Sequence, residues 1–212
     1  MTTTTINRRE VPCCLLCNEV HVENALSRKI KPLTSSTQTS LAESPRLLMI
    51  PDISPVVPGH SLIITKYHCT AFSQISPESC REVQDFKSLA SGIIKKRYGI
   101  APFFFEHGTK PGSVSSAACI SHAHIHVLPA RINVTKHLSQ FSQKPITFHD
   151  TREQDLLNDI NADYLYYEDS SGMACLIRNF LKPLPRQFIR RIVVQEIGIS
   201  ASWNWRESIS LS

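Results

Sequence analysis

The sequence predicts an α+β fold with a mainly antiparallel sheet, one long helix, and a C-terminal extension made of a hairpin and a helix. The order of the predicted elements carries this conclusion: strand, strand, helix, strand, strand, and then the hairpin and helix. Short apolar runs typical of strands stand on both sides of a single long stretch that has a helical apolar stripe.

The composition is that of a globular protein with a core of ordinary size. The chain has 212 residues, of which 42% are apolar and 19% are charged. Its net charge of +5 suits an anionic ligand but is too weak and scattered to indicate nucleic acid. No apolar run reaches the ~20 residues of a membrane span, and the N-terminal residues lack the apolar core of a signal peptide. Seven cysteines argue against a disulfide framework. We therefore expect a cytoplasmic protein with no nucleic acid and no membrane among its partners.

Three regions are expected along the chain. Residues 1–11 read as a flexible tail, residues 12–135 as the main domain, and residues 136–212 as a C-terminal extension packed on that domain. Within the main domain, the segment 29–45 is polar and rich in Ser and Thr, which predicts a loop.

Two strands open the sheet. RLLMI at 46–50 and SLIITK at 61–66 are short apolar runs of strand type. The connection 51–59 contains three prolines and a glycine, so the chain turns there.

One long helix follows these strands. Ser76 suits an N-cap and Pro77 suits the first helical position. Gly99 can end the helix, after a last turn that carries three basic residues. Between these limits, apolar residues recur at spacings of three and four and form one stripe: Val83, Phe86, Leu89, Ala90, Ile93 and Ile94.

The remaining elements are predicted from shorter patterns. They are a strand at 102–106, a flexible loop at 107–121, a strand at 121–128 stopped by Pro129, a hairpin formed by 163–169 and 173–178, and a helix at 185–198.

The strand at 121–128 carries a histidine at every second position, namely His122, His124 and His126. Alternate side chains of a strand point to one face, so the three imidazoles line up while the apolar residues between them bury on the other side. Two chemistries use such an arrangement. Three imidazoles can bind a catalytic zinc ion that also holds water. Alternatively, one neutral imidazole attacks phosphorus while its neighbours donate hydrogen bonds to the phosphoryl oxygens.

The motif His122-Ala-His124-Ile-His126-Val-Leu resembles the H-φ-H-φ-H-φ-φ motif of the HIT family of nucleotide hydrolases and transferases. CLLC at 14–17 is similar to the CxxC near the start of bacterial HIT proteins. The segment 49–68 resembles their D-I-S, G-H and K-x-x-H region, and FFFEHG at 103–108 matches their strand that ends in a polar residue and glycine. The similarity covers residues 13–130 and implies a HIT-like fold with a HIT domain at 12–135.

The resemblance implies a reaction at the α-phosphate of a nucleotide, through a covalent nucleotidyl-histidine intermediate. His124 matches the nucleophile, and His126 matches the histidine that binds phosphate oxygens and assists the leaving group. Asp52 and Ile53 match the pair that holds the nucleoside, and His60 matches a histidine that supports the site. The substrate would be a dinucleoside polyphosphate, a nucleoside phosphoramidate or a similar nucleotide conjugate.

Two alternatives stay open at this point. One is a metal-dependent hydrolase that uses the three histidines as ligands. The other is a nucleotide-binding HIT protein without catalysis.

The resemblance also implies a zinc ion. In zinc-bearing relatives the first histidine of the triad is a metal ligand, which gives the set Cys14, Cys17, His68 and His122 in this chain. Four protein ligands close a tetrahedron, so the implied Zn²⁺ is structural. Cys13 is an alternative ligand, but only Cys14 gives the two-residue spacing. A Mg²⁺ ion carried by the substrate is compatible with this chemistry, and the resemblance further implies a homodimer.

Two positions depart from the family pattern. Cys119 stands where a Ser or Thr hydroxyl usually contacts phosphate, and a thiol is a weaker donor. Glu106 stands where an amide often faces the phosphate, and a carboxylate there would repel the substrate unless it is protonated or turned away.

The C-terminal extension offers further candidates. Arg190 and Arg191 could reach a phosphate chain, but a solvated helix face is the favoured interpretation. Trp203 and Trp205 could stack on a base, but packing against the domain is favoured. PRQFIRR and WNWR in this part resemble a subgroup of bacterial HIT proteins.

Overall fold

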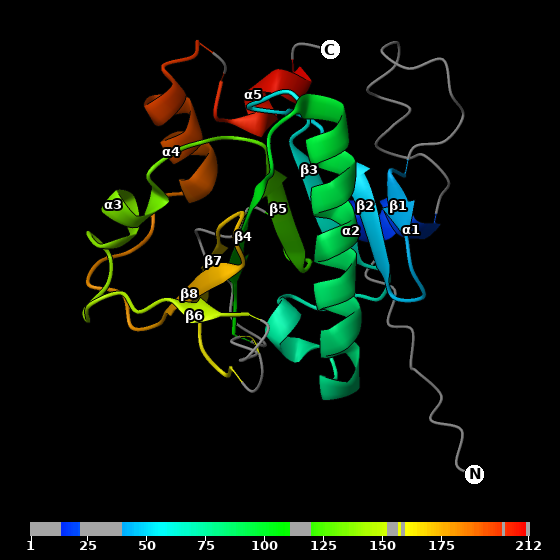
Figure 1. Ribbon diagram of the computed structural model, residues 1–212, viewed down its shortest axis with the longest axis horizontal. Helices are drawn as coiled ribbons and strands as arrows, with labels where there is room; N and C mark the ends of the chain where they lie inside the picture. The colour runs from blue at the N-terminus through cyan, green and yellow to red at the C-terminus, as the bar shows by residue number, and fades with distance from the viewer. Residues whose placement is uncertain are drawn as a thin grey trace.

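The computed structural model describes residues 14–21, 40–110, 120–151, 157, 160–200 and 202–210. The strands form one eight-stranded sheet in the order β1-β2-β3-β5-β4-β7-β8-β6. Every pairing between the described strands is antiparallel. Figure 1 shows the long helix α2 lying in front of this sheet. The predicted α+β class with a mainly antiparallel sheet is confirmed.

The bounds of the strands are β1 (Ala42–Glu43), β2 (Leu47–Pro51), β3 (Ser61–Thr65), β4 (Phe103–Gly108), β5 (His124–Leu128), β6 (His149–Asp150), β7 (Tyr164–Glu168) and β8 (Met173–Ile177). The bounds of the helices are α1 (Leu15–His21), α2 (Cys80–Tyr98), α3 (Val134–Leu138), α4 (Phe188–Ile197) and α5 (Trp205–Ser210), with 3-10 turns η2 (Phe72–Gln74) and η3 (Pro77–Ser79). No helix in these described parts of the chain is long and apolar enough to cross a membrane.

The long helix begins later than predicted and ends where predicted. After Ser76 the chain first makes the 3-10 turn η3, and α2 starts at Cys80. Gly99 has φ of 74° and its N–H donates to the carbonyl of Lys95, which ends the helix in the left-handed conformation that glycine favours. The short elements α1, β1, α3, β6 and α5 were not predicted. The expected tail at 1–11 and residues 111–119 of the expected loop lie outside the described residues.

The strand that carries the histidines is shorter than predicted. It begins at His124, whereas His122 lies on a bend just before it. The neighbouring strand β3 pairs with β5 only as far as the Ile64–His124 partners. The next carbonyl of β3, that of Thr65, lies 2.8 Å from Nε2 of His122. It therefore accepts a hydrogen bond from this side chain. The ladder therefore stops two residues short of His122.

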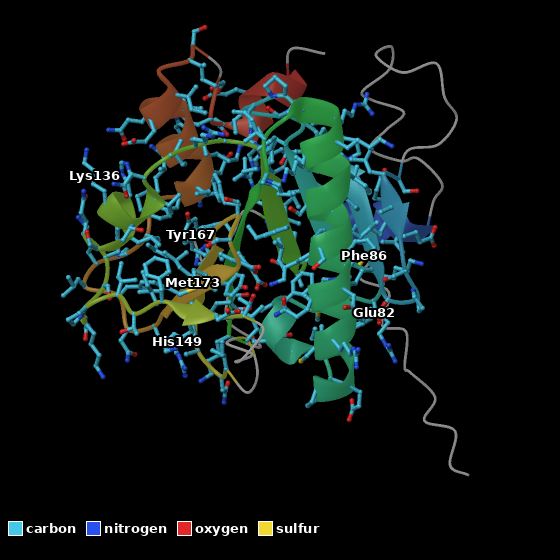
Figure 2. The ribbon with its side chains drawn as sticks, in the orientation of Figure 1. Glu82, Phe86, Lys136, His149, Tyr167 and Met173 are labelled. Atoms are coloured by element: carbon cyan, nitrogen blue, oxygen red, sulfur yellow. The ribbon has the colours of Figure 1, made fainter. Side chains whose placement is uncertain are left out.

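The two faces of the sheet pack against different helices. Ile125 and Val127 of β5 belong to a core cluster that includes the buried stripe of α2. Phe105 of β4 belongs to a second cluster that includes α3 and α4, and it is the cross-strand partner of His126. Since cross-strand partners share a face, His124 and His126 lie on the α4 side. Figure 2 marks one residue of each cluster, Phe86 on α2 and Tyr167 on β7.

The C-terminal hairpin shares this sheet with the main domain. Strand β7 pairs with β4 over five residue pairs, from Phe104–Glu168 to Gly108–Tyr164. A Cβ atom at Gly108 would lie 2.0 Å from the ring of Tyr164, which is fully buried. The ring cannot move aside easily because its hydroxyl donates to Glu106. The hairpin therefore requires glycine at position 108.

We predict that Gly108→Ala destabilises the protein by about 1–3 kcal/mol, because the added methyl group overpacks the β4–β7 pairing. Chemical denaturation measures the free energy of unfolding. The matched control is Gly92→Ala on the exposed side of α2, where a Cβ would meet nothing within 4 Å. That variant should gain roughly 0.5–1 kcal/mol. Equal effects of the two substitutions would contradict the close packing of Gly108 on Tyr164.

Candidate active site and metal centre

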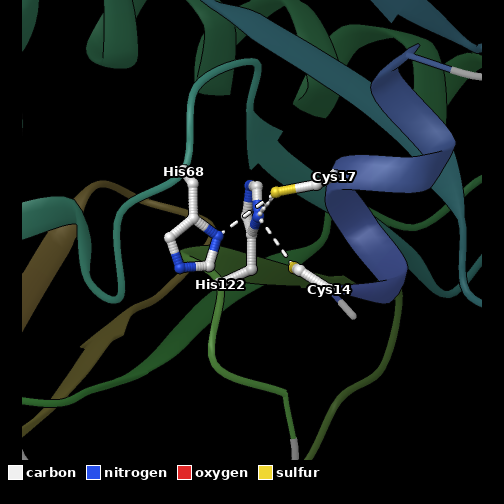
Figure 3. Close-up of side chains that lie close together, drawn as sticks. All are labelled: Cys14, Cys17, His68 and His122. Carbon is white, nitrogen blue, oxygen red and sulfur yellow. Dashed lines mark hydrogen bonds between the residues drawn. The ribbon is translucent and has the colours of Figure 1, made fainter. Parts of the chain in front are cut away.

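A cluster of two thiols and two imidazoles forms where three parts of the chain meet. Cys14 lies just before α1 and Cys17 lies in its first turn, whereas His68 follows β3 and His122 precedes β5. Figure 3 shows the four side chains pointing toward one another. The Sγ atom of Cys17 lies 3.2 Å from Nδ1 of His68 and 3.5 Å from Nδ1 of His122. The Sγ atom of Cys14 lies 3.4 Å from the same Nδ1 of His122.

This geometry could hold a metal ion. One ligand atom from each of the four residues lies within 4.8 Å of the others. Ligands of a tetrahedral zinc ion at ordinary bond lengths are roughly 3.5 Å apart, close to the sulfur–nitrogen separations here. The far nitrogen of His122, Nε2, lies 2.8 Å from the carbonyl oxygen of Thr65. A carbonyl only accepts, so Nε2 carries the proton and Nδ1 keeps its lone pair for a metal.

The hydrogen bond of His124 fixes its tautomer. Its Nδ1 lies 2.7 Å from the backbone oxygen of His122, which only accepts, so Nδ1 carries the proton and Nε2 keeps a lone pair. The side chain of His124 is half-buried, and Nε2 is the ring nitrogen that remains able to act as a base or nucleophile.

The tautomer of His126 follows from that of His60. The backbone N–H of Val56 donates to Nδ1 of His60 over 3.4 Å, so the proton of neutral His60 lies on Nε2. That Nε2 lies 2.9 Å from Nδ1 of His126 and donates to it. His126 must then carry its own proton on Nε2. The two triad histidines of β5 thus present complementary atoms, a lone pair on His124 and an N–H on His126.

An ion pair between Asp52 and Arg190 lies behind these histidines. Oδ1 of Asp52 accepts from the backbone N–H of Ser54 over 2.8 Å and from Arg190 over 3.0 Å. Oδ2 of Asp52 lies 3.5 Å from Nε2 of His60. Both members of the ion pair are buried. The predicted solvated helix face is therefore wrong for Arg190, because helix α4 turns this side chain inward against the loop between β2 and β3.

Burial is the main cause that keeps these histidines neutral. Burial is the main cause that lowers the pKa of His60 to about 4; Asp52 opposes this shift, and Arg190 adds to it. Burial also holds the pKa of His126 well below its ordinary value, helped by His124, His60 and Arg190. The pKa of His124 is likewise lowered by burial. Burial alone would raise the pKa of Asp52, but His60 and Arg190 lower it overall, so the carboxylate is ionised.

Glu106 is turned away from the triad. It lies on β4 next to Phe105, so its side chain points to the α2 side of the sheet. There it accepts from the backbone N–H of Phe72 and from the hydroxyl of Tyr164, each over 2.7 Å. Burial raises its pKa to about 7. A carboxylate at 106 would not repel phosphate if it were protonated or turned away, and the structure shows it turned away, toward Phe72 and Tyr164.

Three other residues were candidates for contacts with a substrate. Ile53 is half-buried beside Asp52 in the loop between β2 and β3. Cys119 lies outside the described residues. Trp203 is partly buried, with the guanidinium of Arg191 at 3.5 Å from its ring centroid. Arg190 is the residue of this network whose role the sequence did not predict, and its only signal was a basic residue at an inward position of the helical stripe of α4.

Comparison with known protein families gives one match, which covers the part of the chain that carries the three histidines. Residues 34–133 match the family model described as HIT domain, which is just under half of the chain. The match and the antiparallel α+β architecture support the HIT family and a HIT-like fold for this part of the chain. No curated protein gave a match.

Solved structures of HIT proteins are among the structural neighbours. A HIT family hydrolase from Clostridium thermocellum is 22% identical, covers 57% of this chain and 94% of its own, with a TM-score of 0.41. A HIT family protein from Bacillus anthracis is 18% identical, with coverages of 68% and 87% and a TM-score of 0.40. A hypothetical histidine triad nucleotide-binding protein from Sulfolobus tokodaii is 22% identical, with coverages of 55% and 68% and a TM-score of 0.39.

We predict that the stability of the protein falls as pH decreases from about 6.5 to about 4, in part because of His60. The folded state keeps this imidazole neutral, whereas the unfolded chain takes up a proton near pH 6.5, so acid favours unfolding. Denaturation at several pH values measures the slope. In His60→Gln the slope between pH 6.5 and 4.5 should be smaller. An unchanged slope would mean that His60 is not held neutral by the fold.

Proposed function

We propose that the protein is a nucleotide hydrolase or nucleotidyltransferase that works through a covalent nucleotidyl group on His124. The observation that carries this proposal is the hydrogen bond from Nδ1 of His124 to the backbone oxygen of His122, 2.7 Å long. It directs the proton to one nitrogen and leaves the other as a nucleophile at neutral pH. The match of residues 34–133 to the HIT domain supports a nucleotide as the substrate.

The proposed reaction has two displacements at the α-phosphorus. Nε2 of His124 donates its electron pair to phosphorus, and the bond from phosphorus to the leaving group breaks with its electron pair on the departing atom, which is then protonated from solvent. The Nε2–H of His126 donates a hydrogen bond to the phosphoryl oxygens as negative charge builds on them. Water, or another acceptor, then attacks phosphorus, loses a proton to solvent, and releases the nucleotide from His124.

The nucleoside end of the substrate is assigned to the loop between β2 and β3. We place the base and sugar against Ile53, which is half-buried there. Asp52 has one oxygen occupied by Ser54 and Arg190, and its second oxygen faces His60. We therefore propose that Oδ2 is the atom of Asp52 available to a ribose hydroxyl, with His60 as support. Cys119 remains the proposed phosphate contact from the segment that follows β4.

We further propose that the cluster of Cys14, Cys17, His68 and His122 holds a structural zinc ion. Two sulfur and two nitrogen donors in a tetrahedral arrangement are typical of zinc. The ion would tie the N-terminal helix α1 to the ends of β3 and β5. Thiolate and imidazole ligands occupy all positions of the tetrahedron, so this ion would supply no open site for a substrate.

The rival in which all three triad histidines bind one catalytic metal is not favoured by the geometry. Two groups of metal-competent residues occur in the described parts of the chain. One contains His122 without His124 or His126, and the other contains His126 with Asp52 and His60. The second candidate is a nucleotide-binding protein without catalysis. Trapping of a labelled nucleotide on His124 distinguishes the enzyme from it.

We predict that mixing the protein with a labelled adenosine phosphoramidate or dinucleoside polyphosphate, followed by alkaline denaturation, leaves label on His124. His124→Ala should abolish labelling, because the only proposed nucleophile is gone. His149→Ala on β6 is the matched control and should label like the wild type, since that imidazole lies outside the site. Failure to trap label with any tested nucleotide would support binding without catalysis.

We predict that the purified protein contains zinc and that Cys17→Ser and His122→Ala lose most of it, because each removes one of four ligands. His124→Ala should keep the metal, since its imidazole is not part of the cluster. Metal analysis of the purified variants measures this. Loss of the metal from His124→Ala would instead support the hydrolase in which the triad itself is the metal site.

A further inference from the structure

The guanidinium of Arg190 joins three separate segments of the chain. Its Nε donates to the carbonyl oxygen of Trp203 over 2.7 Å, on the segment between α4 and α5. Its Nη1 donates to Oδ1 of Asp52 over 3.0 Å. Its Nη2 donates to the backbone oxygen of Ser54 and, over 3.2 Å, to the hydroxyl of the same residue. The side chain is 3% exposed. A planar fork is needed for this set of contacts, and a lysine could not make them.

The same carboxylate continues the network toward the triad. Oδ2 of Asp52 lies 3.5 Å from Nε2 of His60, and this Nε2 lies 2.9 Å from Nδ1 of His126. The backbone supports the path, since the N–H of Asp52 donates to the carbonyl oxygen of His60 over 3.0 Å. A continuous buried path thus leads from helix α4 in the C-terminal extension to the histidine that presents its N–H beside the nucleophile.

We propose that Arg190 is a positioning residue for the triad, which acts through Asp52 to fix the proton of His126. The catalytic meaning of this inference rests on the proposed function. Arg190 holds the carboxylate so that it faces Nε2 of His60, which keeps the proton of that imidazole on the side of His126. His126 in turn keeps its own proton on Nε2, where a phosphoryl oxygen would bind.

A metal ion is the competing interpretation of the same group. Asp52, His60 and His126 each place a ligand atom within 4.8 Å of the others. The guanidinium lies 3.0 Å from the carboxylate, and its permanent positive charge would repel a cation in this buried place. Moreover, the shared nitrogen of His60 is already used as a donor to His126. The arrangement fits a hydrogen-bonded relay better than a cation site.

The positive charge of Arg190 also affects the pH at which His60 and His126 take up a proton. The titratable or charged groups that face one another here are Asp52, His60, His124, His126 and Arg190. Burial is the main cause that lowers the pKa of His60 and His126, and the guanidinium opposes a second positive charge on either ring. Replacing this cation by a neutral side chain should therefore raise the pKa of both imidazoles, with Asp52 still present to favour the protonated forms.

The first test uses the wild-type protein and needs no substrate. In long-range proton–nitrogen NMR spectra we expect His60 and His126 to carry their protons on Nε2, and both rings to stay neutral at pH 7. A proton on Nδ1 of His126 would overturn the proposal. Broadening of the His60 and His126 signals alone on addition of Mn²⁺ would also overturn it, because it would identify a cation site.

The second test removes the guanidinium. In Arg190→Gln we expect the pKa of His60 and His126 to rise by about one unit. With an adenosine phosphoramidate as substrate, the acid limb of the pH profile of kcat/KM should move toward higher pH by a similar amount. Arg191→Gln is the matched control, because the neighbouring arginine lies over Trp203 and not on the carboxylate, and it should shift neither quantity. A folded Arg190→Gln variant with unchanged imidazole pKa values would contradict the proposal.

If Arg190→Gln does not fold, the same NMR measurements are made on Arg190→Lys. It keeps a positive charge but cannot contact Asp52 and Ser54 together, so the expected result is a low imidazole pKa with a mixture of tautomers at His126. A single, unchanged tautomer of His126 would overturn the role assigned to the guanidinium of Arg190. If these NMR results hold while no nucleotide is ever trapped on His124, the relay stands and the proposed enzymatic function fails.

Discussion

The placement of His122 is the constraint on which the rest of the site depends. Its Nε2 donates to the carbonyl of Thr65 at the end of β3, and its Nδ1 faces the thiols of Cys14 and Cys17. Its own backbone oxygen accepts from Nδ1 of His124. One residue therefore closes the candidate metal centre with its side chain and sets the proton of the proposed nucleophile with its backbone. Because both tasks need the chain to bend there, strand β5 begins only at His124.

The other side of the triad is held by a different kind of contact. Buried charges on Asp52 and Arg190 compensate each other, and the second oxygen of the carboxylate faces the His60–His126 pair. The N-terminal helix α1 thus supports the triad through thiols, and the C-terminal helix α4 supports it through a guanidinium. A buried charge without its partner costs much more than the intact pair contributes, so the two halves of this contact depend on each other.

The sequence predicted the elements that have a strong local pattern. The stripe of α2, the glycine that ends it, and the apolar runs of β2, β3, β4 and the β7–β8 hairpin were all recognisable. The short elements α1, β1, α3, β6 and α5 leave too few residues for a periodic pattern, and tertiary contacts decide their structure. The convergence of Cys14, Cys17, His68 and His122 followed from the family resemblance. The inward direction of Arg190 and the direction of Glu106 toward the α2 side of the sheet did not follow from it, because both depend on which side of a packed sheet or helix a polar residue faces.

The most direct test of the account is the nitrogen of His124 to which the nucleotide is attached. Nitrogen-15 labelling with phosphorus NMR of the trapped protein distinguishes the two ring nitrogens by their coupling to phosphorus. The hydrogen bond between Nδ1 of His124 and the carbonyl of His122 predicts a bond from phosphorus to Nε2. Attachment at Nδ1 would contradict it, because that nitrogen could then not be the one that holds the proton against the backbone.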